Sequence, residues 1–351
     1  MISVRPADPA ARPVASLLFF AYNHEAFVEE ALLSTLRQDV GMFELVVVDD
    51  ASTDRTRAIM EEVLARETPP GVTVRRLYKD KNAGLISAVN DAMALAAGEI
   101  FVLMAGDDIS MPCRLARSLR TFADLPSVQL VYGECLKIDE AGQAYAAIPG
   151  DKGPRFFSYD AAPMTRIYAN SSPFGASAAY RRRLFDVFGP MAEGDHGEDN
   201  CYWIRALLVG EIYWDPAVFV HWRQHAGNLS NFTSHLGDAE WRRRHLAWME
   251  SHATFSEQWL KDIMLAREAG LISWVRAQRL KVAALREDRS WALEASSLRR
   301  DPWAEWLSCT LKLLYVGRFS TTLKMLKLRL FRHRQERKWR FWAKLKSNPA
   351  A

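Results

Sequence analysis

The chain has 351 residues, of which 49% are hydrophobic and 25% are charged. This length and composition exclude a disordered, collagen-like or low-complexity protein and allow two domains with buried cores. The formal net charge is +4, but the segment from Lys312 onward holds twelve of the 46 Lys and Arg residues and a single acid, Glu336. A basic C-terminus on an acidic body predicts an anionic partner, either a membrane surface or nucleic acid.

The cysteines and apolar segments favour a cytoplasmic location. The cysteines are far apart and form no C-x-x-C pair, which indicates reduced thiols rather than disulfides or structural zinc; they are Cys113, Cys135, Cys201 and Cys309. The sequence shows no signal peptide and no window of about 18 uncharged apolar residues. We therefore expect a cytoplasmic protein without a membrane span.

The first half of the chain alternates apolar strands with amphipathic helices. We expect strands at 15–21, 44–48, 72–77, 100–104 and 128–132. We expect helices at 25–38, 52–66, 84–97 and 111–122. This alternation predicts parallel β-α-β units, and so an α/β fold with a mostly parallel sheet flanked by helices.

The pattern changes twice along the second half of the chain. After about Gly133 it becomes loop-rich, and helical spacing returns at 182–188 and 198–208 before a strand-like stretch at 212–220. Beyond residues 231–236 proline and glycine become scarce and helical periodicity dominates. The sequence therefore predicts one domain at 1–231 and an α-helical C-terminal region at 232–351.

Two pairs of aspartates follow two of the expected strands. Asp49-Asp50 comes after a run of three valines, and Asp107-Asp108 comes after the strand at 100–104. Aspartate is also a common turn former, so either pair alone is ambiguous. Ligands bind at the carboxyl ends of parallel strands, and two such pairs in one sheet favour a site. The first pair suits a ribose or a base N–H, and the second suits Mg²⁺ or Mn²⁺.

A third acidic pair, Glu198-Asp199, opens the expected helix at 198–208. Acids at a helix N-terminus complement the helix dipole, which is the structural alternative. The functional interpretation is a general base, with Arg205 binding an anion or orienting the acid. His225 lies close to Arg223 and Asn228, a combination that suits either a structural role or a metal or phosphate site.

Several nucleotide and hydrolase motifs are missing. The chain has no G-x-x-x-x-G-K-[ST] loop, which excludes a P-loop NTPase. It has no G-x-G-x-x-G after the first strand, which disfavours a nicotinamide-binding domain. The absence of G-x-S-x-G and H-E-x-x-H disfavours hydrolase and zinc-protease chemistry.

Five short motifs occur in a characteristic order. They are Phe20-Ala21-Tyr22-Asn23, the segment 47–54, Asn82-Ala83-Gly84, Gly106-Asp107-Asp108 and Gly197-Glu198-Asp199. In this order they resemble the family 2 glycosyltransferases, and the resemblance covers about residues 14–231. It implies the GT-A nucleotide-diphospho-sugar transferase fold, an inverting mechanism, a nucleotide-sugar donor and a divalent metal, Mn²⁺ or Mg²⁺.

The resemblance also implies a role for each matched residue. Asp199 would be the base, with Glu198 as second choice. The implied metal site is Asp107 with Asp108 and His225. The implied donor-binding residues are Tyr22, Asn23, Asp49, Asp50, Asn82, Gly84, Asp107 and Arg223. Ala105 stands where the family's Asp-x-Asp has its first aspartate, so the number of metal-binding carboxylates stays open.

The basic C-terminal segment suggests where the acceptor is found. Phe319, Leu323, Leu326 and Leu330 recur at helical spacing among Lys and Arg residues, which is typical of a helix on an anionic membrane. The alternative is a helix that packs on the body. Nucleic acid is disfavoured, because the body is acidic and no recognition motif is present.

We expect sugar transfer to a hydroxyl of a glycan or lipid-linked acceptor, in surface polysaccharide or glycolipid biosynthesis. The tail would then place the protein peripherally on the inner face of the cell membrane. The alternative is a non-catalytic, membrane-associated scaffold that retains the fold. Whether the helical region also forms a homodimer is left open by the sequence.

Overall fold

The computed structural model describes residues 13–147, 155–157, 175–192, 197–228, 246 and 257–285. Contacts divide the chain into two compact units: Met1–Asn231 with Glu257–Ala283, and Phe232–Ser256 with Ala284–Ala351. Nearly all described residues belong to the first unit. The basic segment from Phe319 lies outside the described residues, and the division into 1–231 and 232–351 stays a prediction.

One ten-stranded sheet organises the first unit, in the order β3-β2-β1-β4-β9-β6-β10-β5, with β7 on β6 and β8 on β10. The strands that pair in parallel are β1 with β2 and β4, β2 with β3, and β6 with β10. The strands are β1 Ala15–Ala21, β2 Phe43–Asp49, β3 Val72–Tyr78, β4 Ile100–Ala105, β5 Ile109–Ser110, β6 Val128–Ile138, β7 Ala144–Ala147, β8 Arg155–Phe157, β9 Ala179–Arg181 and β10 Glu211–Arg223.

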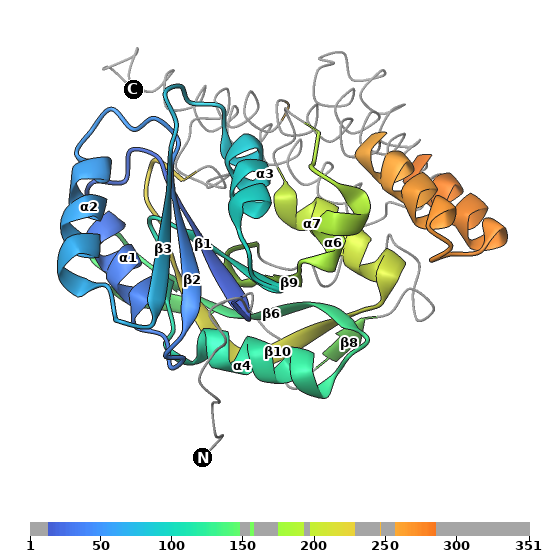
Figure 1. Cartoon of the computed structure of the whole chain (residues 1–351), viewed down its shortest axis with the longest axis horizontal. Helices are drawn as coiled ribbons and strands as arrows, with labels where there is room; N and C mark the ends of the chain where they lie inside the picture. Colours follow the sequence, from blue (N-terminus) through green and yellow to red (C-terminus); the bar gives the residue numbers. More distant parts are fainter. Residues whose placement is uncertain are drawn as a thin grey trace, which may run out of the picture. The chain divides into compact units, whose positions relative to one another are not determined.

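Helices cover both faces of the parallel part of this sheet. Helices α1 and α2 lie on one side of β1–β3, and α3 lies on the other (Figure 1). The helices are α1 Val28–Leu36, α2 Thr56–Glu67, α3 Leu85–Leu95, α4 Cys113–Asp124, α6 Arg183–Phe188 and α7 Glu198–Val209, with the short 3₁₀ helix η2 Gly175–Ser177. Two further helices span 257–268 and 274–285.

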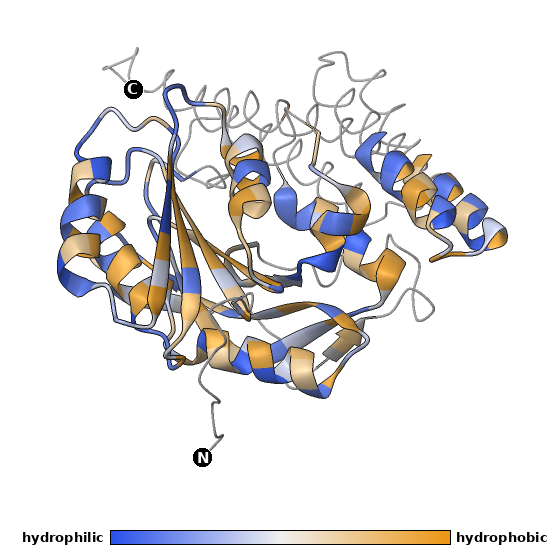
Figure 2. Ribbon diagram, in the orientation of Figure 1, coloured by the Kyte–Doolittle hydropathy of each residue, from blue (hydrophilic) through white to orange (hydrophobic). Residues whose placement is uncertain are grey.

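The central strands are buried along their whole length. Every residue of β1 and β2 is buried, as expected for strands with helices on both faces. Figure 2 shows the strands as mostly hydrophobic and the hydrophilic faces of α1 and α2 turned away from them. The predicted α/β fold, with a mostly parallel sheet flanked by helices, is therefore confirmed. No helix in the described part of the chain is long and apolar enough to cross a bilayer.

Parallel pairing brings the ends of three strands to one edge of the sheet. Ala21 at the end of β1 lies opposite Asp49 at the end of β2, and Phe20 lies opposite Ala105 at the end of β4. The ladder continues past the strands, because the Asp50 N–H donates to the Ala21 carbonyl at 3.1 Å. Both aspartate pairs therefore emerge at the same edge, as predicted.

The strand expected at 128–132 is longer than predicted. Strand β6 runs through Gly133 to Ile138, and β10 runs beside it to Arg223. A side chain at position 133 would meet the Phe219 ring at 2.2 Å, so this glycine makes room for an aromatic ring of the neighbouring strand. In a strand interior, glycine can mark close packing rather than a strand end.

Candidate active site

Asp49 and Asp50, at the end of β2, differ in their hydrogen bonding. The Asp50 carboxylate accepts the backbone N–H groups of Ala83 at 3.1 Å and Gly84 at 2.8 Å, and so holds the loop before α3. Gly84 has φ +84°, a conformation that favours glycine. Asp49 is 2% exposed, and its Oδ1 has no hydrogen-bond partner among the described residues. Asp49 thus carries a buried acceptor atom with a free hydrogen-bonding capacity.

The turn after β1 joins this region to the end of β2. Asn23 adopts φ 53°, its N–H donates to Ser52 Oγ at 2.9 Å, and its Oδ1 accepts the Thr53 N–H at 2.8 Å. Its side chain therefore braces two loops. Tyr22, by contrast, is 42% exposed, which leaves its ring open to a ligand. Asn82 is exposed beside this edge of the sheet.

One carboxylate oxygen after β4 is surrounded by side-chain nitrogen atoms. Asp107 Oδ2 lies 3.0 Å from His225 Nε2, 3.5 Å from Asn228 Nδ2 and 3.8 Å from His24 Nε2. His225 belongs to the metal site that the sequence predicts, whereas His24 enters the site only through the structure. Burial opposes ionisation of Asp107, but the contacts with His225 and His24 outweigh it, so the Asp107 pKa lies below its ordinary value.

The glycine of the Gly106-Asp107-Asp108 motif has a packing reason. A Cβ at Gly106 would lie 2.9 Å from His24 Nδ1 and 3.0 Å from the Phe20 carbonyl oxygen. The backbone at this position is therefore pressed against the end of β1. His24 Nδ1 has no hydrogen-bond partner among the described residues, and burial lowers the pKa of the His24 imidazole.

Asp108 and Arg223 face each other inside the protein. Asp108 is 2% exposed, and its Oδ1 accepts the backbone N–H of Arg223 at 2.9 Å. Burial and the neighbouring Asp107 raise the pKa of Asp108 well above its ordinary value. The Arg223 guanidinium donates to the carbonyls of Asp107 at 2.9 Å and Glu140 at 2.8 Å, and to Glu30 Oε2 at 2.6 Å. Both side chains are thus engaged by protein groups.

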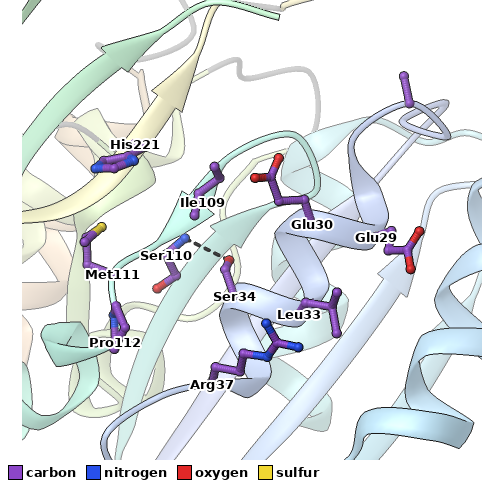
Figure 3. A pocket seen from close by; sticks show the side chains of 11 residues that line it. Glu29, Glu30, Leu33, Ser34, Arg37, Ile109, Ser110, Met111, Pro112 and His221 are labelled. Atoms are coloured by element: carbon purple, nitrogen blue, oxygen red, sulfur yellow. Dashed lines mark hydrogen bonds between the residues drawn. The ribbon is translucent and has the colours of Figure 1, made fainter. Parts of the chain in front are cut away.

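A groove of about 590 Å³ lies between α1 and the β5–β10 pair (Figure 3). None of the predicted site residues lines it. Its charged groups are paired: Glu30 holds Arg223, and Glu29 bonds Arg66 at 3.1 Å. Figure 3 shows the Ser110 N–H donating to Ser34 Oγ, which attaches β5 to α1. The groove is therefore next to the site rather than part of it: its residue Glu30 holds Arg223, and Arg223 in turn bonds the Asp107 carbonyl.

The acidic pair at the start of α7 packs against a glycine. A Cβ at Gly175 would lie 2.5 Å from Glu198 Oε1 and 3.1 Å from Asp199 Cβ. Asp199 Oδ1 accepts the Asn200 N–H at 2.8 Å. Burial raises the pKa of Asp199 to about 6, against hydrogen bonds from the backbone of Asn200 and Gly175. Tyr180 is buried beside the pair, and its hydroxyl has no hydrogen-bond partner among the described residues.

The hypothesis that Arg205 binds an anion is wrong, because its guanidinium is used by Asp262 and the Gly189 carbonyl rather than by Asp199 or a ligand. Arg205 is fully buried and pairs with Asp262 through bonds of 2.8 and 3.2 Å, and its third nitrogen donates to the Gly189 carbonyl at 2.8 Å. These contacts use the guanidinium inside the fold. Arg205 lies close to Asp199 in the sequence, but its ion-pair partner is Asp262, which lies 57 positions further along the chain.

Two comparisons decide the family. The sequence profile described as Glycosyl transferase family 2 matches residues 16–188. A protein of Nostoc sp. named as an uncharacterized glycosyltransferase is 24% identical over 260 residues, which cover 71% of this chain and 75% of the relative. The chain contains a family 2 glycosyltransferase domain. The predicted family and enzyme class are therefore confirmed.

The glycosyltransferase domain shares its fold with solved structures. S. aureus TarS 1–349 in complex with UDP-GlcNAc matches with a TM-score of 0.54 at 17% identity, covering 90% of this chain and 91% of that chain. The mannosyltransferase PcManGT from Pyrobaculum calidifontis, in complex with GDP-Man and Mn²⁺, matches with a TM-score of 0.51 at 20% identity, covering 92% and 88%. These likenesses confirm the predicted GT-A type of fold.

Proposed function

We propose that the glycosyltransferase domain moves a sugar from a nucleotide-diphosphate donor to an acceptor hydroxyl, with inversion at the anomeric carbon. The observation that carries this is the placement of two acidic groups with opposite properties in one fold. Asp107 has a lowered pKa and nitrogen donors around it, whereas Asp199 has a pKa raised to about 6. One suits a permanent negative charge and the other a base that takes up a proton.

We assign the nucleoside end of the donor to the ends of β1 and β2. The support is the exposed Tyr22 ring, which offers a stacking surface for a nucleobase, and the pair of carboxylates at the end of β2 beside it in the sheet. Asp50 and Gly84 shape the loop that carries Asn82. Asn23 supports the same edge of the sheet through its bonds to the loop after β2. The two solved structures that share this fold were determined with a UDP-sugar and a GDP-sugar.

We propose Asp107 and His225 as the ligands of a divalent ion. Within the described ranges, no group of three or more His, Cys, Asp and Glu side chains is arranged to hold a metal. The carboxylate oxygen and imidazole nitrogen are nevertheless suitable donors for Mn²⁺ or Mg²⁺, which fill their remaining positions with phosphate oxygens and water. The chemistry that a bound ion supplies there is neutralisation of charge on the leaving diphosphate.

Asp199 is the proposed base. The acceptor oxygen forms a bond to the anomeric carbon as the bond from that carbon to the diphosphate oxygen breaks, and the acceptor proton passes to the Asp199 carboxylate. A single in-line displacement inverts the anomeric centre. Glu198 is the second candidate, and its carboxylate lies against the same Gly175. A carboxylate with a pKa near 6 is ionised at neutral pH and accepts a proton readily.

Because Asp199 must be ionised, transfer is expected to depend on pH. The rate constant kcat should rise as pH increases through about 6 and then level off, and Asp199→Asn should remove this limb. The measurement is the pH profile of nucleoside diphosphate release between pH 4.5 and 9 in buffers of constant ionic strength. A flat profile across pH 6 in the wild type would contradict the assignment of the base.

Arg223 and Asp108 are proposed as positioning residues for Asp107. Arg223→Lys is expected to lower the free energy of unfolding by about 2 kcal/mol, because one ammonium cannot replace the hydrogen bonds to Asp107, Glu140 and Glu30. Metal-dependent donor affinity should fall with it. Calorimetric unfolding and donor titration measure the two effects. Arg37→Lys, at an exposed arginine of the same groove, is the matched control and should change neither.

We further propose that the acceptor is a glycan or a lipid-linked glycan at the inner face of a membrane. The support is the basic, aromatic C-terminal sequence, with twelve Lys and Arg residues from Lys312 onward. A non-catalytic scaffold would have no need of Asp107, Asp199 and His225 together. A homodimer and a cytoplasmic location stay predictions.

The test of the proposed function is a donor panel. Purified protein is titrated with UDP-, GDP- and dTDP-sugars in Mn²⁺ and in EDTA, with thermal shift and nucleoside diphosphate release as readouts. We expect the sugar donors of one nucleotide to raise the Tm of the protein in Mn²⁺, and we expect most of that increase to be lost in EDTA. A folded protein that responds to no donor would favour the scaffold.

A further inference from the structure

The segment Gly189–Ala192 lies between α6 and the acidic pair of α7, and side chains from three helices hold it. We name Asn90, Arg205 and Gln258 the clamp residues. Asn90 of α3 accepts the Met191 N–H and donates to the Met191 carbonyl, both at 2.9 Å. Arg205 of α7 donates to the Gly189 carbonyl at 2.8 Å.

The third clamp residue comes from far along the chain. Gln258, in the helix at 257–268, is 2% exposed, and its Oε1 accepts the Ala192 N–H at 2.9 Å. Its Nε2 donates to Asp262 Oδ1 at 2.8 Å. Asp262 in turn forms the fully buried pair with Arg205. One helix therefore holds both the segment before α7 and the middle of α7 itself.

This helix lies outside the part of the chain that the family profile matches, which ends at residue 188. Arg276 of the next helix adds a bond to the Leu207 carbonyl near the end of α7, at 3.2 Å. The contacts belong to one compact unit, since Glu257–Ala283 groups with the first 231 residues. The two helices at 257–268 and 274–285 thus contact α7 through an ion pair and a hydrogen bond.

We propose that the helix at 257–268 positions the base, with Gln258 and Asp262 acting on Asp199 through the Gly189–Ala192 segment and through α7. This inference rests on the proposed role of Asp199. The clamped segment ends at Ala192, shortly before α7 begins at Glu198, and Arg205, two turns into α7, is held by Asp262. A shift of about 1 Å in a reacting group can cost 100-fold in rate, so such bracing matters for catalysis.

The pKa of Asp199 depends on where its carboxyl group lies relative to its neighbours. The groups that face it are Glu198 on its own helix, Tyr180 on β9 and the backbone N–H of Gly175. A movement of α7 changes the burial of Asp199 and its distance from Tyr180 and from the Gly175 N–H. The titration of the Asp199 carboxyl is therefore a local readout that a general loss of stability would not move.

The test is Gln258→Met, which keeps the size of the side chain and removes both hydrogen bonds. The Asp199 carboxyl is followed by NMR with ¹³C-labelled aspartate, and Asp199→Asn assigns the signal. We expect the titration midpoint to move away from about 6 by at least about half a unit. With UDP-GlcNAc or GDP-mannose as donor, kcat should fall about 10- to 100-fold while the donor KM stays within about twofold.

Lys261→Ala, on the exposed face of the same helix, is the matched control and should change neither quantity. Asn90→Ser loosens the same segment from α3 and serves if Gln258→Met does not fold. An Asp199 titration identical to the wild type in the folded variant overturns the inference. If Asp199→Asn retains full transfer, the proposed base is wrong instead. The double variant Asp199→Asn/Gln258→Met should be no slower than Asp199→Asn alone, because Gln258 acts through Asp199.

Discussion

Asp199→Asn is expected to lower sugar transfer by about 10²- to 10⁴-fold, because the acceptor hydroxyl then has no base to take its proton. Donor binding should be unchanged, since the proposed donor contacts lie at the ends of β1, β2 and β4. The measurements are kcat for transfer and the donor Kd by calorimetry. Glu198→Gln is the matched control: a larger loss there than in Asp199→Asn would move the base to Glu198.

The same substitution should make the protein more stable at neutral pH. The Asp199 pKa is about 6 in the folded state, above its ordinary value of 3.8, so the unfolded chain loses this proton first as pH rises. The free energy of unfolding therefore falls between pH 4 and pH 6 and stays lower above it, by about 3 kcal/mol for a shift of this size. Asparagine keeps an oxygen for the two backbone N–H groups and carries no charge. We therefore expect Asp199→Asn to have a higher Tm than the wild type at pH 8 and to lose transfer. That result would show that the ionised Asp199 carboxylate, which catalysis needs, destabilises the folded protein.

Asp107→Ala is expected to weaken donor binding in Mn²⁺ by about 10- to 100-fold, the magnitude of a lost charge-assisted interaction. In EDTA the wild type and the variant should bind the donor equally weakly. Calorimetric titration of the donor under both conditions measures the difference. Asp124→Asn, at an exposed aspartate that ends α4, is the control and should behave as the wild type. Unchanged metal-dependent affinity in Asp107→Ala would remove Asp107 from the donor site.

Local sequence patterns were sufficient to predict the parallel strands of the sheet and the edge at which the aspartate pairs lie. The apolar run at 15–21 is β1 with the bounds expected, and the two aspartate pairs stand at neighbouring strand ends. Both predictions rest on periodicity and on the geometry of parallel strands, which are properties of short segments. The same reasoning made the strand expected at 128–132 too short, because Gly133, which accommodates Phe219, has the same appearance as a glycine that ends a strand.

The partners of the charged residues could not be predicted in this way. Arg205 pairs with Asp262, and Arg223 reaches Glu30 across 193 positions. His24 enters the site only because Gly106 lets the chain after β4 press against the end of β1. Each of these contacts joins segments that are distant in sequence, and nothing in the composition of either segment marks its partner. Arginines near catalytic motifs are therefore as well explained by buried pairing as by binding of an anion.

The configuration of the product tests the central proposal most directly. The donor identified by the panel is incubated with the wild-type protein, Mn²⁺ and a membrane-derived lipid-linked acceptor, and the anomeric coupling of the new linkage is read by ¹H NMR. We expect the configuration opposite to that of the donor, formed by the wild type and not by Asp199→Asn. A product with the configuration of the donor, or equal amounts formed by both proteins, would contradict a single displacement with Asp199 as the base.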